Sequence, residues 1–318
     1  MVKTFLSTTK KDSGRSNHII RKRGKSLTEN NKAALIFLAP MLVGIFVLVL
    51  YPIIESFRLS FFIIQPGANV NKFVGLMNYR FAWNDFVLWR TLWNTTKMAL
   101  MEVIITVPLS FIIATLINNA KKTGNIYKVL YYLPNITSVT ATAIVFRFVF
   151  YSSDSGIVNF LLGKLGLEPV RWLTSMQWAP ITVVIFSFWL RMGFNVLICL
   201  AALQTISREM YEAAEIDGAG PVKKWWYITL PLAKPILLYI LIMTMIASMK
   251  RFNETFVLGG EEGLPGGSLF TTVMYMYTVA FKSANVTYGA TIAVFLFVII
   301  LIMTVINTRF IRFNESDY

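Results

Sequence analysis

The sequence predicts an all-α, polytopic membrane protein with about six transmembrane helices, and three observations support this fold class. Apolar residues make up 56% of the 318 positions and charged residues only 14%, whereas soluble domains carry about 25% charged residues. The mean hydropathy is +0.60. The apolar residues also gather in long stretches that polar or Gly- and Pro-containing segments separate.

Each predicted span is an apolar stretch of about 20 residues or more, the length that a helix needs to cross a bilayer. Because lipid offers no hydrogen-bond partners, the backbone of each span must be satisfied within its own helix. Turn residues or charges follow the first three spans, a long loop follows the fourth, and a segment with several glycines follows the fifth. In chain order the predicted spans are residues 33–57, 90–118, 127–150, 178–204, 232–257 and 286–309.

The distribution of positive charge predicts the orientation of the spans. Residues 1–32 hold nine Lys or Arg residues against two acids, directly before the first span. With this tail inside, 18 of the 30 Lys and Arg residues lie on inner segments and nine on outer ones. Positively charged segments stay cytoplasmic, so both the tail 1–32 and the short C-terminal tail 310–318 are expected in the cytoplasm, with the six-helix transmembrane domain at 33–309 between them.

Composition also excludes several functions. The chain has one cysteine, Cys199, and one histidine, His18, so we expect no disulfide, no thiolate metal cage, no metal site and no catalytic residue in this chain. Half of the net charge of +14 lies in the N-terminal tail, where it acts as a topology signal rather than as a nucleic-acid interface.

The loop at residues 205–231 is predicted to be a cytoplasmic helix-turn-helix. Ser207 is a good N-cap for a helix over 208–217, and Gly218 can end that helix in a left-handed turn. Gly220-Pro221 opens a second short helix, which Pro231 should end. The first helix carries adjacent small residues, so it suits insertion into a groove of a partner; an amphipathic connector on the membrane surface is the alternative.

A motif in this loop resembles that of a known family. Glu212-Ala213-Ala214, three residues, Gly218, nine residues and Ile228-x-Leu230-Pro231 resemble the EAA signature of permease subunits in binding-protein-dependent ABC importers. Further matches, such as Tyr51-Pro52, Leu133-Pro134 and Gly193-Phe194, extend the resemblance to all but the N-terminal tail. Together they are similar to the carbohydrate-uptake branch, of the maltose or multiple-sugar type, and to the first of its two paired permeases.

The resemblance implies an importer of several subunits in the cell membrane. The expected partners are a second homologous permease, two cytoplasmic ATP-binding subunits that use ATP and Mg, an extracytoplasmic solute-binding protein, and a sugar or oligosaccharide. This chain would bind no cofactor and would not be an enzyme. The residues that would couple it to the ATPase are Tyr211, Glu212, Ala213, Ala214, Ile216, Asp217, Gly218, Ala219, Ile228, Leu230 and Pro231.

Polar and aromatic residues in spans four and five are the candidate sugar contacts. A sugar needs aromatic platforms and fork-like hydrogen-bonding groups, and related carbohydrate permeases also draw sugar contacts from these spans. Packing against the partner permease is the alternative for each residue. The candidates are Ser187, Trp189, Arg191, Phe194, Asn195, Phe252, Asn253 and Thr255.

Charged residues near these spans support two narrower expectations. Arg191, Arg251 and Lys250 suggest an acidic sugar such as a uronate oligosaccharide, because guanidinium binds carboxylate through two hydrogen bonds. Lys97 and Glu102 lie on different faces of one helix, so Glu102 is expected to bond a neighbouring span.

If transport is driven by ATP, the ATP must be bound and hydrolysed by another chain. Gly24-Lys25-Ser26 resembles the end of a phosphate-binding loop, but the position five residues before Gly24 is Ile19 rather than the required glycine. The rival function is an ATP-independent secondary carrier. Such a carrier would show an inverted repeat, and the loop between spans four and five has no counterpart between spans one and two.

Overall fold

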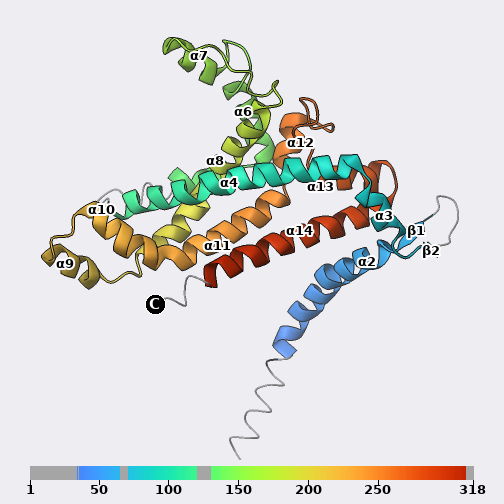
Figure 1. Cartoon of the computed structure of the whole chain (residues 1–318), viewed down its shortest axis with the longest axis horizontal. Coiled ribbons are helices and arrows are strands. Elements are labelled where there is room, and N and C mark those ends of the chain that lie inside the picture. The colour runs from blue at the N-terminus through green and yellow to red at the C-terminus, as the bar shows by residue number, and fades with distance from the viewer. Residues whose placement is uncertain (1–33, 35, 65–70, 120–129, 313–318) are drawn as a thin grey trace, which may run out of the picture. The chain divides into compact units, whose positions relative to one another are not determined.

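The computed structural model describes residue 34 and residues 36–64, 71–119 and 130–312 (Figure 1). It divides into two compact units, up to Arg58 and from Leu59 onward, and each is described by itself. In the first unit an apolar helix begins at Ile36, widens into the π-helical turn η1 (Phe46–Leu50) and continues as α2 (Tyr51–Leu59). None of its apolar window is buried, as expected of the predicted span at 33–57.

The second unit is almost entirely helical. A two-stranded antiparallel sheet, with Phe62 opposite Phe73, lies at its start. In chain order the elements are β1 (Phe62–Ile64), β2 (Asn71–Phe73), α3 (Met77–Trp83), α4 (Phe86–Asn119), η2 (Leu133–Ile136), α6 (Val139–Val149), α7 (Ile157–Lys164), α8 (Trp178–Leu203), α9 (Arg208–Ile216), α10 (Pro221–Lys224), η3 (Trp225–Thr229), α11 (Leu230–Met249), α12 (Asn253–Gly259), α13 (Thr272–Tyr277), η4 (Thr278–Lys282) and α14 (Val286–Arg312).

Helix α8 lies at the centre of this unit, because 61% of its most apolar window is buried. It packs against α4 and α11, and α11 packs in turn against α14. Figure 1 shows α4, α11 and α14 running side by side, with α9 and α10 at one end and α3 and α13 at the other. Burial of Phe186, Val183 and Val184 on α8 supplies much of the apolar contact in this core.

Five helices of the described residues are long and apolar enough to cross a membrane, where the sequence predicts about six. They are Ile36–Leu59, Phe86–Asn119, Trp178–Leu203, Pro221–Met249 and Val286–Arg309. These helices correspond to the first, second, fourth, fifth and sixth predicted spans.

The third predicted span, 127–150, is wrong as a continuous helix. Residues 127–129 lie outside the described part of the chain. The short helix η2 contains Pro134 in its first turn and ends before extended backbone at Thr137 and Ser138. Ser138 then accepts a hydrogen bond from the backbone N–H of Ala141 and so caps α6, which has 11 residues. An N-cap side chain needs extended backbone, so a capping serine interrupts a stretch that hydropathy alone reads as one helix.

The fifth predicted span also differs. Its helix ends at Met249, and the segment Lys250 to Phe252 separates it from α12. At the other end, Pro231 does not end a short helix, because α10, η3 and α11 form one continuous helix from Pro221. A π-helical turn precedes Pro231, and such a wider turn accommodates the missing N–H and the ring of proline.

A close backbone contact fixes η2 against α8. A Cβ atom at Gly193 would overlap the carbonyl group of Tyr131 and crowd the Cα atom of Tyr132. Because all the crowded atoms belong to the backbone, they cannot rotate away as a side chain could.

We therefore expect Gly193→Ala to destabilise the protein by about 1–3 kcal/mol through overpacking. Thermal unfolding of the purified protein measures the effect. Gly163→Ala is the matched control, because nothing lies within 4 Å of a Cβ atom at Gly163 and alanine favours a helix. Equal melting temperatures for the two variants would contradict the close contact.

Candidate functional site

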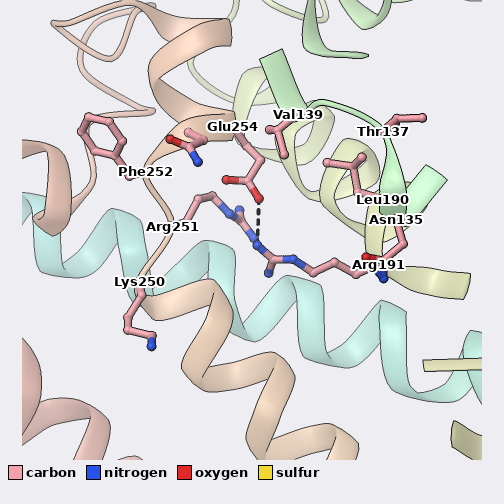
Figure 2. A pocket seen from close by; sticks show the side chains of 10 residues that line it. Asn135, Thr137, Val139, Leu190, Arg191, Lys250, Arg251, Phe252 and Glu254 are labelled. Atoms are coloured by element: carbon pink, nitrogen blue, oxygen red, sulfur yellow. Dashed lines mark hydrogen bonds and ion pairs between the residues drawn. The ribbon is translucent and has the colours of Figure 1, made fainter. Parts of the chain in front are cut away.

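A cavity of about 270 Å³ lies beside the break between α11 and α12 (Figure 2). Three separate segments contribute to it: the start of α6 with the turn before it, the middle of α8, and the break itself. The lining residues are Asn135, Thr137, Val139, Leu190, Arg191, Lys250, Arg251, Phe252, Asn253 and Glu254.

The centre of the break is a completely buried arginine. Arg251 is 1% exposed, and its guanidinium forms an ion pair with Glu102 of α4, which is fully buried. The same guanidinium donates a hydrogen bond to the hydroxyl of Ser248 at 2.8 Å, and the Thr271 hydroxyl donates to the backbone carbonyl of Arg251 at 3.0 Å. An ion inside the membrane needs such partners, so these contacts explain why helix α11 stops here.

A second arginine joins the same group of charges from α8. Arg191 donates to Glu254 of α12 at 2.8 Å, the contact drawn in Figure 2, and to Glu102 at 3.3 Å. The expectation that Glu102 bonds a neighbouring span is therefore confirmed. Two arginines and two glutamates, here called the charge network, connect α4, α8, the break and α12, and their formal charges sum to zero.

The cavity beside the charge network combines different chemical groups. Phe252 offers an aromatic ring, Asn135 and Asn253 offer amides, and Thr137 offers a hydroxyl. The Lys250 ammonium is exposed and takes part in none of the ion pairs recorded among the described residues. Such a cavity can bind a ligand that is rich in hydroxyl groups and has apolar faces.

The structure brings together only part of the predicted substrate set. Arg191, Phe252 and Asn253 line the cavity. Ser187, Asn195 and Thr255 are buried, the ring of Trp189 packs at a tilt against that of Phe146, and Phe194 is 46% exposed outside the cavity lining.

Several lining residues are missing from the predicted set. Asn135 and Thr137 follow Pro134, and a proline next to Asn and Thr residues is typical of a turn. In an apolar stretch this pattern would have indicated that the helix breaks there. Glu254 lies next to Asn253, and an acidic residue within an apolar span is by default a functional candidate. Lys250 was predicted only as a contact for an acidic sugar.

The other predicted site is α9 with its C-terminal turn. The Ser207 side chain accepts a hydrogen bond from the backbone N–H of Glu209, as its N-cap position predicts. Gly218 has a φ of 77°, and the N–H groups of Gly218 and Ala219 donate to the carbonyls of Glu215 and Ala214. This is the paired bonding of a Schellman turn, for which glycine is the favoured residue.

The surface of α9 is left uncovered in this chain. Ile216 is 88% exposed and Met210 is 45% exposed, and Glu212 and Ala213 are also exposed. Val222, Trp226 and Tyr227 on the following helix are 70%, 56% and 80% exposed. An apolar surface of this kind is typical of an interaction site.

Contacts between side chains tie α9 to the long helices. The hydroxyls of Tyr211 and Thr229 lie 3.0 Å apart, and Lys224 forms an ion pair with Glu215 at 3.4 Å. Trp225 of η3 donates to Thr115 of α4 at 3.3 Å. Helix α9 is therefore fastened to α10 and η3, which continue as α11 and lead to the cavity.

No metal site is evident in the part of the chain that the structure describes, where no three His, Cys, Asp or Glu residues come together. The cavity chemistry above suits an organic, hydroxylated ligand.

Comparison with known proteins gives consistent matches. The family described as "Binding-protein-dependent transport system inner membrane component" matches residues 106–313. The arabinooligosaccharides transport system permease protein AraP of Bacillus subtilis (strain 168) is 35% identical over 287 residues, which cover 90% of each chain. The lactose transport system permease protein LacF of Rhizobium radiobacter is 33% identical, over 88% of this chain and 93% of that protein.

A solved structure shares the fold. A chain of a bacterial alginate ABC transporter, in complex with an alginate pentasaccharide-bound periplasmic protein, superposes with a TM-score of 0.75. It covers 88% of this chain and 93% of its own, at 20% identity. An identity of 20% supports a shared fold alone.

The charge network makes a testable prediction for Glu102. Glu102→Gln leaves Arg251 buried without its counter-ion, and removing one partner of a buried pair costs about 3–5 kcal/mol. We expect a marked fall in the melting temperature of the purified protein. Glu261→Gln is the control, because the pair of Glu261 with Lys282 is 63% and 38% exposed and exposed pairs contribute little. A Glu102→Gln protein as stable as the control variant would refute the network.

Proposed function

The chain belongs to the family of binding-protein-dependent transport system inner membrane components, and from this premise we propose that it is the transmembrane permease subunit of an ATP-driven sugar importer. The sugar or oligosaccharide is delivered by an extracytoplasmic binding protein. The single observation that carries the proposal is the similarity to AraP, a protein named for arabinooligosaccharide transport, across 90% of both chains.

The proposed importer contains further subunits. A second homologous permease, two ATP-binding subunits and the binding protein complete it, and ATP with Mg is hydrolysed in the ATP-binding subunits rather than in this chain. Both termini lie in the cytoplasm of a bacterial cell, in agreement with the basic tail at 1–32.

Helix α9 is the proposed coupling helix, and its exposed surface docks into a cleft of an ATP-binding subunit. Closure of the ATP-binding subunits moves α9 as a rigid body. The contacts of Tyr211 with Thr229 and of Glu215 with Lys224 carry this motion into the helix that begins at Pro221. That helix ends at the cavity, so motion of α9 changes the position of its walls.

The proposed substrate site is the cavity at the break. Arg191 and Arg251 are already paired with Glu102 and Glu254, so their charges are balanced within the chain. Lys250 is then the group best placed to meet a carboxylate, and the proposal of an acidic sugar rests on this residue. A neutral sugar would use the amides, the hydroxyl and the Phe252 ring.

The first prediction concerns coupling. Gly218→Val places a β-branched residue at a φ of 77°, a conformation that costs about 1–2 kcal/mol for a residue with a Cβ atom. We expect this strain to distort the turn after α9 and to reduce substrate-stimulated ATP hydrolysis by the reconstituted complex, without loss of substrate binding.

Gly220→Val serves as the control for coupling. Gly220 has extended backbone, with a φ of −70°, and open space around the added Cβ atom, so ATP hydrolysis should stay near that of the unchanged complex. Normal stimulation in the Gly218→Val complex would remove α9 from the coupling role.

The second prediction concerns the substrate site. Asn253→Ala removes an amide from the cavity wall, and loss of one hydrogen bond to an uncharged ligand costs about 0.5–1.5 kcal/mol. We therefore expect the substrate concentration for half-maximal uptake to rise about two- to tenfold. Asn84→Ala is the control, since the Asn84 amide lies outside the cavity lining and donates to the carbonyl of Arg80. Uptake should be measured across neutral and acidic oligosaccharides.

In the same assay, Lys250→Met distinguishes the two sugar classes. If the substrate is acidic, this variant should lose uptake of acidic sugars selectively; unchanged preference would assign a neutral substrate. Unchanged uptake of every sugar by Asn253→Ala would place the substrate site elsewhere.

A further inference from the structure

A second cavity, of about 250 Å³, lies near the beginning of α4 and shares no lining residue with the cavity at the break. Four of its lining residues come from α4, two from the approach to α8 and its first turn, and one from the loop before α13. They are Arg90, Trp93, Asn94, Lys97, Met176, Pro180 and Ser268.

The residues from α4 form one continuous face of that helix. Positions 90, 93, 94 and 97 are three, four and seven residues apart, the spacing at which side chains of a helix share a face. Lys97 lies 11 residues after the start of α4 at Phe86, or about 16 Å along the helix axis. Side chains of a helix lean toward its N-terminus, so the Lys97 ammonium leans toward Arg90.

The positive charges of this cavity have no counter-ion within the described chain. Arg90 donates to the backbone carbonyl of Gly266, and neither Arg90 nor Lys97 takes part in an ion pair recorded for the described residues. No acidic residue lines the cavity. Arg90 and Lys97 are both exposed, so an anion from outside the chain can reach them, and cations near a membrane surface attract anionic groups.

The cavity also contains an unused hydrogen-bond donor. Ser268 is 9% exposed, and its hydroxyl is buried without a hydrogen-bond partner. The neighbouring loop is held in place, because the Asn94 amide donates to the carbonyls of Gly267 at 2.9 Å and of Phe270 at 3.2 Å. A buried hydroxyl without a partner costs free energy, and an anionic oxygen in the cavity would accept its hydrogen bond.

Tryptophans place this cavity at the level of lipid headgroups. Trp93 lines it and is 68% exposed. Trp89, 40% exposed, lies about one helical turn before Trp93 in α4, and Trp83, 65% exposed, is the last residue of α3. Exposed tryptophans mark the interface between hydrocarbon and headgroups.

We propose that this cavity binds the phosphodiester of an anionic phospholipid headgroup. Arg90 and Lys97 neutralise its charge, the Ser268 hydroxyl donates to a phosphate oxygen, and Trp93 lies against the glycerol and the first methylene groups. The site is separate from the sugar cavity and does not depend on which sugar is transported.

The test uses the complete transporter complex, purified in a neutral detergent and titrated with phosphatidylglycerol, with bound lipid counted by native mass spectrometry. Lys97→Met keeps the apolar stem and removes the charge, and we expect about fivefold weaker binding, the contribution of one cation near a membrane surface. Lys97→Arg should restore binding. Lys72→Met is the control, because Lys72 is an exposed strand residue outside the cavity.

Ser268→Ala is the second variant, in case Lys97→Met does not assemble, and it should weaken phosphatidylglycerol binding without changing the charge. Equal binding by the parent, Lys97→Met and Ser268→Ala complexes would overturn the proposal. Glycerol 1-phosphate that binds as tightly as phosphatidylglycerol would identify a free phosphate compound instead of a lipid. A cross-link from position 97 to an acidic residue of another subunit would identify a protein counter-ion, and would also overturn it.

Discussion

The pairing of two arginines with two glutamates inside an apolar bundle is the constraint on which the rest of the structure depends. Arg251 and Glu102 are both buried, so neither can ionise without the other. Helix α11 ends at Met249, and Arg251 in the break that follows forms the ion pair with Glu102. Arg191 and Glu254 then hold α8 and α12 beside the break, so one balanced set of charges both shapes the cavity and leaves Lys250 free to face a ligand.

The same break is the end of a continuous mechanical connection. Helix α9 is exposed where it would meet a partner, but its Tyr211 and Glu215 are fastened to the helix that runs from Pro221 to Met249. A long helix transmits displacement with little bending. The hydrogen bonds of α11 end with the N–H groups of Lys250 and Arg251, and those of α12 begin at the carbonyl of Phe252, so the chain resists displacement less at this interruption. Motion at α9 would therefore concentrate at the cavity, which suits a subunit that is driven by ATP hydrolysis in another chain.

Local features of this protein could be predicted from sequence, and features that join distant residues could not. Ser207 and Gly218 act through their own neighbours, so the bounds of α9 follow from capping rules.

Glu102 and Arg251 are separated by 149 positions. Sequence spacing excludes a bond from Glu102 to Lys97 but cannot identify Arg251 as the partner. Pro231 was misread because a π-helical turn precedes it, and proline rules for the α-helix do not predict such a turn. Trp225 in this turn donates a hydrogen bond to Thr115 of α4, a contact that sequence spacing does not indicate. Among the sugar candidates, Ser187 and Arg191 are four residues apart and share one face of α8. Arg191 lines the cavity whereas Ser187 is buried, because distant elements decide what packs beside each residue.

A double-mutant cycle between Glu102 and Arg251 tests the central claim most directly. The free energies of unfolding of Glu102→Gln, of Arg251→Met and of the double variant would be measured by equilibrium unfolding in mixed micelles. If the two charges hold the break together, the double variant loses less stability than the two single variants combined, by about 1–3 kcal/mol. Strictly additive losses would show that the charges act independently, and the account of the cavity would then be wrong.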